Sequence, residues 1–209
     1  MPQVMMFVII SLYAGYGDIN TTLRAPPLIL QSVTMTLKKT NMRLFNGHLK
    51  LEEASLRKVF LMQLGNIFSG KTYLIANLPL IADSASFQDL KHAITETIGD
   101  IQVQLLRMDV IYEMIGEHYQ PQQCMGIRAL TIETFTAAKT PGLSDLERDL
   151  LLLYHLNNLE SIEISSFTFL HDMALSMPVK DMTILLRQNL DMAKDNKELF
   201  EMISREYIN

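Results

Sequence analysis

The sequence Phe60–Pro79, FLMQLGNIFSGKTYLIANLP, carries the strongest structural signal in the chain. Pro79 lies near its end, and the turn and capping residues Asp83–Ser86 follow. Steps of three, four or seven residues place the apolar side chains on one face of an α-helix. The pattern therefore predicts an amphipathic helix that starts near Leu51 and buries one line of side chains: Leu56, Phe60, Leu64, Ile67, Leu74 and Leu78.

The chain after residue 45 repeats this helical spacing and shows no strand period. Gly116 closes a second helix over residues 90–115. A shorter helix is predicted over about 123–138. Ser144 and Glu147 have the spacing of a capping box for a helix over about 145–176, and Pro178 suits the first turn of a last helix that ends near residue 206. Long helices with short links predict an all-α, antiparallel four-helix bundle with an additional short helix.

The composition excludes several classes of protein. A net charge of −5 argues against nucleic-acid binding, which usually needs a basic face. Cys124 is the single cysteine, which excludes a disulfide framework and a multi-cysteine metal site. A single cysteine also fits a reducing compartment, so we expect a cytoplasmic protein. The apolar run Val4–Ala14 is too short to span a bilayer, and no membrane association is expected.

Residues 1–44 differ in character from residues 45–209, which we assign to the bundle. The first segment contains Gly15, Gly17, Pro26 and Pro27 and has no helical period. We interpret it as a poorly structured extension, with Met42 as a candidate natural start. A weak export signal and a docked strand or hairpin are the alternatives. We expect residues 1–41 to be dispensable for folding.

Polar residues interrupt the apolar lines of the predicted helices. Lys71 stands between Ile67 and Leu74, and the last helix has the line Met182, Leu185, Asn189, Met192, Asn196, Leu199 and Ile203. Burying an ionised side chain is costly without a partner, so each charged interruption either reaches solvent or joins a buried cluster. Both interpretations remain open. The candidates for a buried cluster on three helices are Lys71, Asp100, Glu160 and Glu163, with Thr97 and Gln104 beside Asp100.

The order and spacing of several segments resemble the YciE/YciF-type ferritin-like proteins, a bacterial stress-induced family of unknown function. The resemblance covers about residues 51–206. Its best segment runs from Phe60 to Pro79, and further matches include Arg107-Met108, Ile111-Tyr112, Gly116-Glu117, Ala129-Leu130, Leu159-Glu160 and Glu163-Ile164. The resemblance implies a ferritin-like bundle, a di-iron site and frequent dimers.

This chain departs from the family at the implied metal ligands. Lys71 stands where the family has a glutamate, Thr97 and Ser161 stand at histidine positions, and Met192 replaces part of an acidic run. A protonated lysine cannot bind a metal. We therefore predict a vestigial site with no metal, no other cofactor and no catalytic residue. Its candidate remnants are Asp100, Gln104, Glu160 and Glu163, with Lys71 as an internal cation.

These observations predict a non-catalytic, stress-related scaffold or interaction protein. The alternative is a residual metal-binding protein, either a di-iron type oxidoreductase or a metal-handling protein. The run Leu150–Leu153 presents apolar residues on every side of its helix. That run and the family resemblance predict a homodimer, and an unidentified protein partner is compatible with it.

Overall fold

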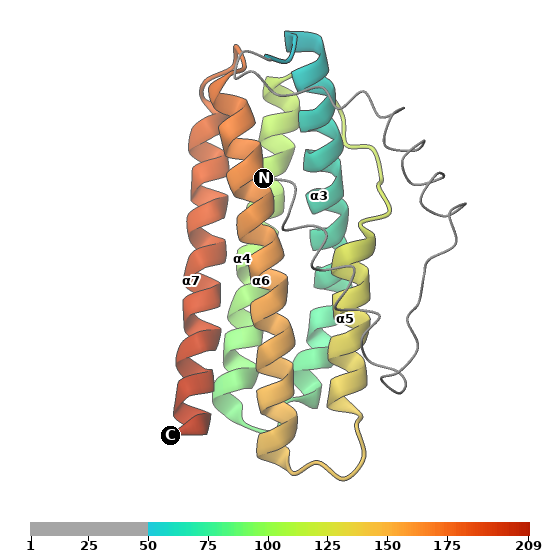
Figure 1. Ribbon diagram of the computed structural model, residues 1–209, viewed down its shortest axis with the longest axis vertical. Helices are drawn as coiled ribbons and strands as arrows, with labels where there is room; N and C mark the ends of the chain where they lie inside the picture. Colours follow the sequence, from blue (N-terminus) through green and yellow to red (C-terminus); the bar gives the residue numbers. More distant parts are fainter. Residues whose placement is uncertain (1–49) are drawn as a thin grey trace, which may run out of the picture. The chain divides into compact units, whose positions relative to one another are not determined.

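The computed structural model describes residues 50–209, and every regular element in that range is an α-helix (Figure 1). The helices are α3 (Glu53–Ser84), α4 (Gln88–Met114), α5 (Met125–Ala138), α6 (Asp145–Leu175) and α7 (Met182–Ile208). The predicted fold of four long helices and one short helix is confirmed. The extension assigned to residues 1–44 lies outside the described residues.

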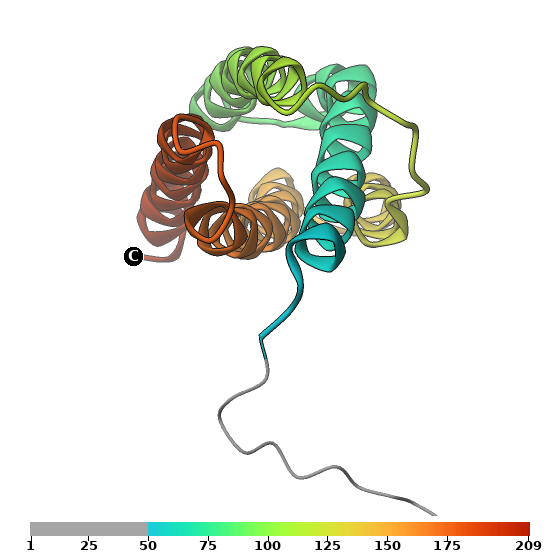
Figure 2. The ribbon, with the colours of Figure 1, turned by 90° about the horizontal axis from the view of Figure 1, so that it is seen from above.

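The four long helices form a ring in which neighbours run antiparallel, in the order α3, α4, α7 and α6 (Figure 2). The short helix α5 packs outside this ring against α3 and α6. The link from α4 to α6, which includes α5, returns the chain from one end of the bundle to the other (Figure 1). One such crossover is typical of ferritin-like bundles.

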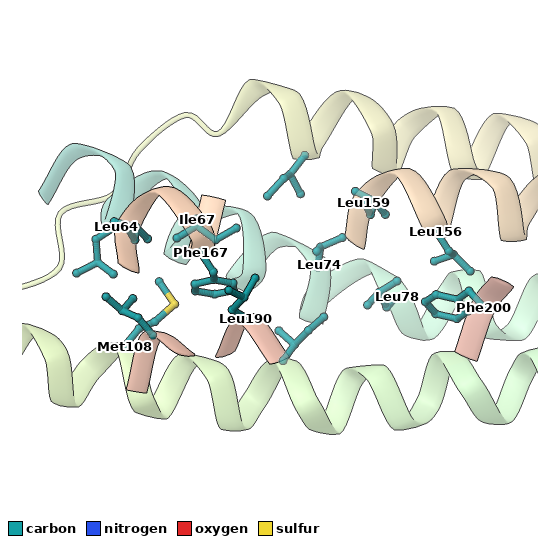
Figure 3. Close-up of a cluster of buried hydrophobic side chains, with 14 of the residues drawn as sticks. Leu64, Ile67, Leu74, Leu78, Met108, Leu156, Leu159, Phe167, Leu190 and Phe200 are labelled. Atoms are coloured by element: carbon teal, nitrogen blue, oxygen red, sulfur yellow. The ribbon is translucent and has the colours of Figure 1, made fainter. Parts of the chain in front are cut away.

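The centre of the ring is filled by apolar side chains, among them the line predicted on α3 (Figure 3). Phe60, Leu64 and Leu78 of α3 have 0 to 2% of their surface exposed, and Phe167 and Phe200 are fully buried opposite α3 and α4. Burial of this apolar surface, at about 25 cal/mol per Å², is the main driving force for the fold.

α7 starts later than predicted. Pro178 lies in the loop between α6 and α7, and the helix begins at Met182. Met177 is buried in the core, and the Lys180 Nζ donates a hydrogen bond of 2.6 Å to the Leu175 carbonyl at the end of α6. These two contacts hold the connecting residues as a turn, so the prediction that Pro178 opens the helix is wrong.

The buried face of α7 is also displaced by one residue from the predicted line. Leu186, Ala193 and Phe200 are buried, whereas Leu185, Met192 and Leu199 are only partly buried, at the border of the core. Met182 and Ile203 are buried as predicted, and the polar Asn189 and Asn196 between them are buried as well. The helix carries apolar residues at both sets of positions, so packing against α4 and α6 decides which set faces inward.

Helix ends and close contacts follow local sequence signals. Gly116 has a φ of 67°, a left-handed conformation that glycine adopts without steric cost, and it ends α4 as predicted. The predicted capping box of Ser144 and Glu147 is present at the start of α6. A Cβ at Gly70 would lie 2.3 Å from the Ile127 Cδ1, so this glycine allows α5 to approach α3 closely.

No helix within residues 50–209 is both long enough and apolar enough to cross a membrane.

Candidate functional site

A buried ion pair lies at the centre of the bundle. The Lys71 side chain on α3 is fully buried, and its Nζ donates hydrogen bonds to the Glu163 Oε2 on α6 and the Gln104 Oε1 on α4. The Glu163 side chain is 1% exposed. Of the two interpretations of Lys71, the structure therefore supports the buried cluster and not a lysine that reaches solvent.

The fourth long helix joins this cluster through Asn189. The Gln104 Nε2 donates to the backbone carbonyl of Asn189 at 3.1 Å, and the Asn189 Nδ2 donates to the backbone carbonyl of Gln104 at 3.2 Å. All of these groups are buried, where an unmade hydrogen bond would cost about 1–3 kcal/mol. One connected polar network therefore links α3, α4, α6 and α7.

The Lys71 ammonium group lies beside an aromatic ring that packs in the apolar core. The Lys71 Nζ lies 5.3 Å from the centre of the Phe167 ring, within the range of a cation–π interaction. Figure 3 shows Phe167 between Ile67 and Leu190, which belong to three different helices. An ion pair with such neighbours is shielded from water, so its electrostatic interaction is stronger than on the surface.

Glu160 is a second buried acid in this region, one helical turn before Glu163. Its side chain is buried, and burial raises the pKa of the Glu160 carboxyl well above its usual range. The negative charge of Glu163 raises that pKa further, whereas Lys71 opposes the shift. One lysine cannot neutralise two acids, so Glu160 keeps its proton to a higher pH than an ordinary glutamate.

Replacing Glu160 with glutamine is expected to change the pH dependence of stability. As the pH rises above about 4.3, the unfolded chain releases this proton while the folded chain retains it. The contribution of Glu160 to stability therefore falls with rising pH, and a glutamine has no such loss. Urea unfolding should show similar stability for both proteins near pH 4 and a more stable variant near pH 8. A parallel pH dependence in the two proteins would contradict the assignment.

Three polar atoms near this cluster have no hydrogen-bond partner within residues 50–209: the Glu160 Oε2, the Glu163 Oε1 and the Asn196 Nδ2. Two of them are oxygens of the same acidic pair that Lys71 faces. The cluster thus combines one cation, two carboxyl groups and several amides in a water-excluding core.

The other candidate residues lie at the edge of the cluster or outside it. Asp100 is partly exposed, and burial together with Glu96 raises its pKa. Thr97 is buried, but its hydroxyl donates to the Ala93 carbonyl of its own helix at 3.0 Å. Ser161 is exposed, so its difference from the family does not affect the cluster. Met192 lies at the border, where its sulfur accepts a hydrogen bond from Arg107 at 2.8 Å.

This set of residues does not fit the di-metal centre that the ferritin-like resemblance implies. Within residues 50–209, no three His, Cys, Asp or Glu side chains gather in a group that could hold a metal ion. A divalent cation needs several anionic or neutral donors, and Lys71 places a positive charge beside Glu163. The chemistry of the donor set therefore favours an internal ion pair over a metal bridge.

Sequence reasoning missed two polar residues with clear structural roles. Arg107 donates to the Asn189 Oδ1 at 3.3 Å and so supports the network from its edge. Asp149 is fully buried, and its carboxylate accepts hydrogen bonds from the backbone N–H groups of Ser86 and Phe87. The available signal for Asp149 was its position three, four and seven residues before the buried Leu152, Leu153 and Leu156.

The chain has similar folds among solved structures. It is similar to the E. coli stress protein YciF, with 20% sequence identity and a TM-score of 0.71, covering 74% of this chain and 97% of that one. It is also similar to YcfI from Rhodopseudomonas palustris, with 20% identity and a TM-score of 0.66, covering 76% and 98% of the two chains.

These likenesses confirm the ferritin-like helical bundle predicted from the sequence, and at this identity they concern the fold alone. No curated protein matches the chain. Residues 55–209 match the family described as "Domain of unknown function (DUF892)", and the chain therefore belongs to this family, which confirms the predicted YciF-type membership.

Proposed function

We propose that this protein is a non-catalytic, stress-related scaffold or interaction protein in which an internal ion pair takes the place of a metal centre. The observation that carries the proposal is the fully buried Lys71, whose Nζ contacts both Glu163 and Gln104. A single ammonium group there links three helices, as a bridging metal ion would, without redox or Lewis-acid chemistry. The description of the similar E. coli protein as a stress protein supports the stress-related role.

Metal binding tests this proposal directly. The purified protein is expected to contain no stoichiometric iron or manganese, and neither Fe²⁺, Mn²⁺ nor EDTA should shift its melting temperature. A metal bound to the folded state alone would stabilise it by about 2.7 kcal/mol at 100 times its dissociation constant, which is easily measured. The E. coli YciF protein, treated identically, would serve as a comparison with the same fold.

A specific observation supports the alternative of a residual metal-binding protein. Two buried carboxylate oxygens, the Glu160 Oε2 and the Glu163 Oε1, have no partner within residues 50–209. Together with Asp100 at the edge, they could supply an incomplete set of hard oxygen donors. Stoichiometric metal in the assay above, lost in Glu160→Gln, would favour a metal-handling or oxidoreductase function and reject the scaffold proposal.

The homodimer remains a prediction of the proposed scaffold role. In the run that motivates it, Leu152 and Leu153 are buried in the core, whereas Leu151 is 37% exposed and the neighbouring Tyr154 is 60% exposed. Part of the apolar run is thus explained by the bundle itself, which leaves Leu151, Tyr154 and the partly buried Leu150 for a contact with a second chain.

A further inference from the structure

The Lys71 ammonium group touches two groups with which an amine can react. It donates to the carboxamide oxygen of Gln104 and to the carboxylate of Glu163, and all three side chains are buried. For two reactive groups held in an attack geometry, the effective concentration can reach about 10⁵–10⁸ M. The same contacts that form the ion pair therefore place a potential nucleophile, an electrophile and a base side by side.

We propose that Lys71 and Gln104 form an intramolecular amide crosslink between α3 and α4, with Glu163 as the proton acceptor. The inference rests on the proposed function: the ion pair is the state before the reaction, and the crosslink then replaces it as the link between α3 and α4. It makes the chain a protein that strengthens its own core by a covalent bond.

The reaction balances without any further reagent. The Lys71 ammonium transfers a proton to the Glu163 Oε2, and the neutral Nζ forms a bond to the Gln104 Cδ. A proton then moves from Nζ to the Gln104 Nε2, and the bond between Cδ and Nε2 breaks. The products are the Lys71–Gln104 amide, one molecule of ammonia and a protonated Glu163.

The geometry favours Gln104 over Glu163 as the electrophile. Glu163 holds the proton that Lys71 releases and so acts as the acid–base group, which leaves the Gln104 carboxamide as the other carbonyl group that Nζ contacts. The Gln104 side chain is fixed at both ends, because its Oε1 accepts from Lys71 and its Nε2 donates to the Asn189 carbonyl. The amine must shift only from the Gln104 oxygen to the adjacent carbon, which the flexible lysine side chain permits.

The low-polarity surroundings favour the crosslinked state. The reaction converts a buried ammonium and a buried carboxylate into a neutral amide and a neutral acid, which removes the desolvation cost of two charges. Phe167 and the neighbouring apolar side chains exclude the water that hydrolysis would need. The released ammonia reaches bulk solvent when the bundle opens locally, and dilution then opposes the reverse reaction.

The mass of the full-length protein tests the proposal. Measured under denaturing conditions, freshly purified or after prolonged incubation of the folded protein, it is expected to be about 17 Da below the sequence mass, because one ammonia is lost. Trypsin cannot cleave after an acylated lysine, so the peptide Val59–Lys91 should appear joined to His92–Arg107. This linked pair separates the crosslink from ammonia loss at other side chains.

Variants assign the role of each group. Gln104→Met removes the electrophile, and Glu163→Gln removes the base, so both should keep the full mass and release separate peptides. Gln102→Met changes an exposed glutamine on the same helix and should retain the crosslink. The mass and the peptides of the wild-type protein test the crosslink directly, so the inference can be tested even if Glu163→Gln does not fold.

Two results would overturn the inference. One is an unmodified mass and separate peptides in folded, aged wild-type protein. The other is a loss of about 18 Da located to Lys71 and Glu163, which would mean that water left and that Glu163 was the electrophile. Neither result would affect the proposed function, because the metal assay tests for a metal centre independently of the crosslink.

Discussion

Replacing Lys71 with methionine is expected to lower the free energy of unfolding by about 3–5 kcal/mol. Methionine has a similar length, but it loses the cation–π contact with Phe167 and leaves Glu163 in the core without its cation. The Gln104 Oε1 also loses its hydrogen-bond donor. The loss would be measured by urea unfolding at neutral pH, monitored by far-ultraviolet circular dichroism.

Lys91→Met is the matched control for this experiment. Lys91 pairs with Asp83 at 3.1 Å, but the two side chains are 39% and 72% exposed. Solvent screens such a pair, so its loss should change stability by less than about 1 kcal/mol. If Lys71→Met were as stable as Lys91→Met, the buried pair would have no structural importance and the scaffold proposal would lose its main support.

Lys71→Glu extends the argument to the metal question. The variant places a third acid beside Glu160 and Glu163, so in the absence of metal it should be at least as destabilised as Lys71→Met. Added Mn²⁺ is expected to recover part of the lost stability, because the cluster then offers three carboxyl groups and no ammonium. If Mn²⁺ did not change the stability of this variant, features other than Lys71 would also prevent the cluster from binding a metal.

Much of the fold could be predicted because helical periodicity and helix ends are local signals. The apolar line of α3 depends on residues three and four apart, and the capping box of Ser144 and Glu147 lies within a single turn. The line on α7 was displaced because Leu185 and Leu186, like Leu199 and Phe200, offer two competing apolar faces. Only the packing of the neighbouring helices distinguishes them.

The cluster was predictable in part for the same reason. Lys71, Glu160 and Glu163 interrupt apolar lines, so spacing alone could identify them as candidates for a buried cluster but could not decide between burial and exposure. The hydrogen-bond partners of these side chains could not be inferred from spacing, because the distance between side chains on different helices depends on the rotation and depth of each helix. The exchange of hydrogen bonds between Gln104 and Asn189 joins residues 85 positions apart, which no local pattern contains.

Replacing Asp149 with alanine is the second change with a large expected effect, a loss of about 3 kcal/mol. The Asp149 carboxylate on α6 accepts hydrogen bonds from the Ser86 N–H at 2.9 and 3.1 Å and from the Phe87 N–H at 3.0 Å. These N–H groups precede α4, which has no side-chain cap of its own. A negative charge near the N-terminus of α4 is also stabilising, because that end of the helix dipole is positive.

The variants Asp149→Asn and Asp83→Ala separate these contributions. Asparagine keeps one acceptor oxygen but removes the charge, so its loss of stability should be smaller than that of alanine. Asp83 lies in the same region but is 72% exposed, so Asp83→Ala should change stability by less than about 1 kcal/mol. Hydrogen exchange adds a local measurement, because the first turn of α4 should exchange faster in Asp149→Ala while the centre of α6 stays protected. Unchanged exchange at this turn would show that water replaces the carboxylate and that Asp149 is not the cap of α4.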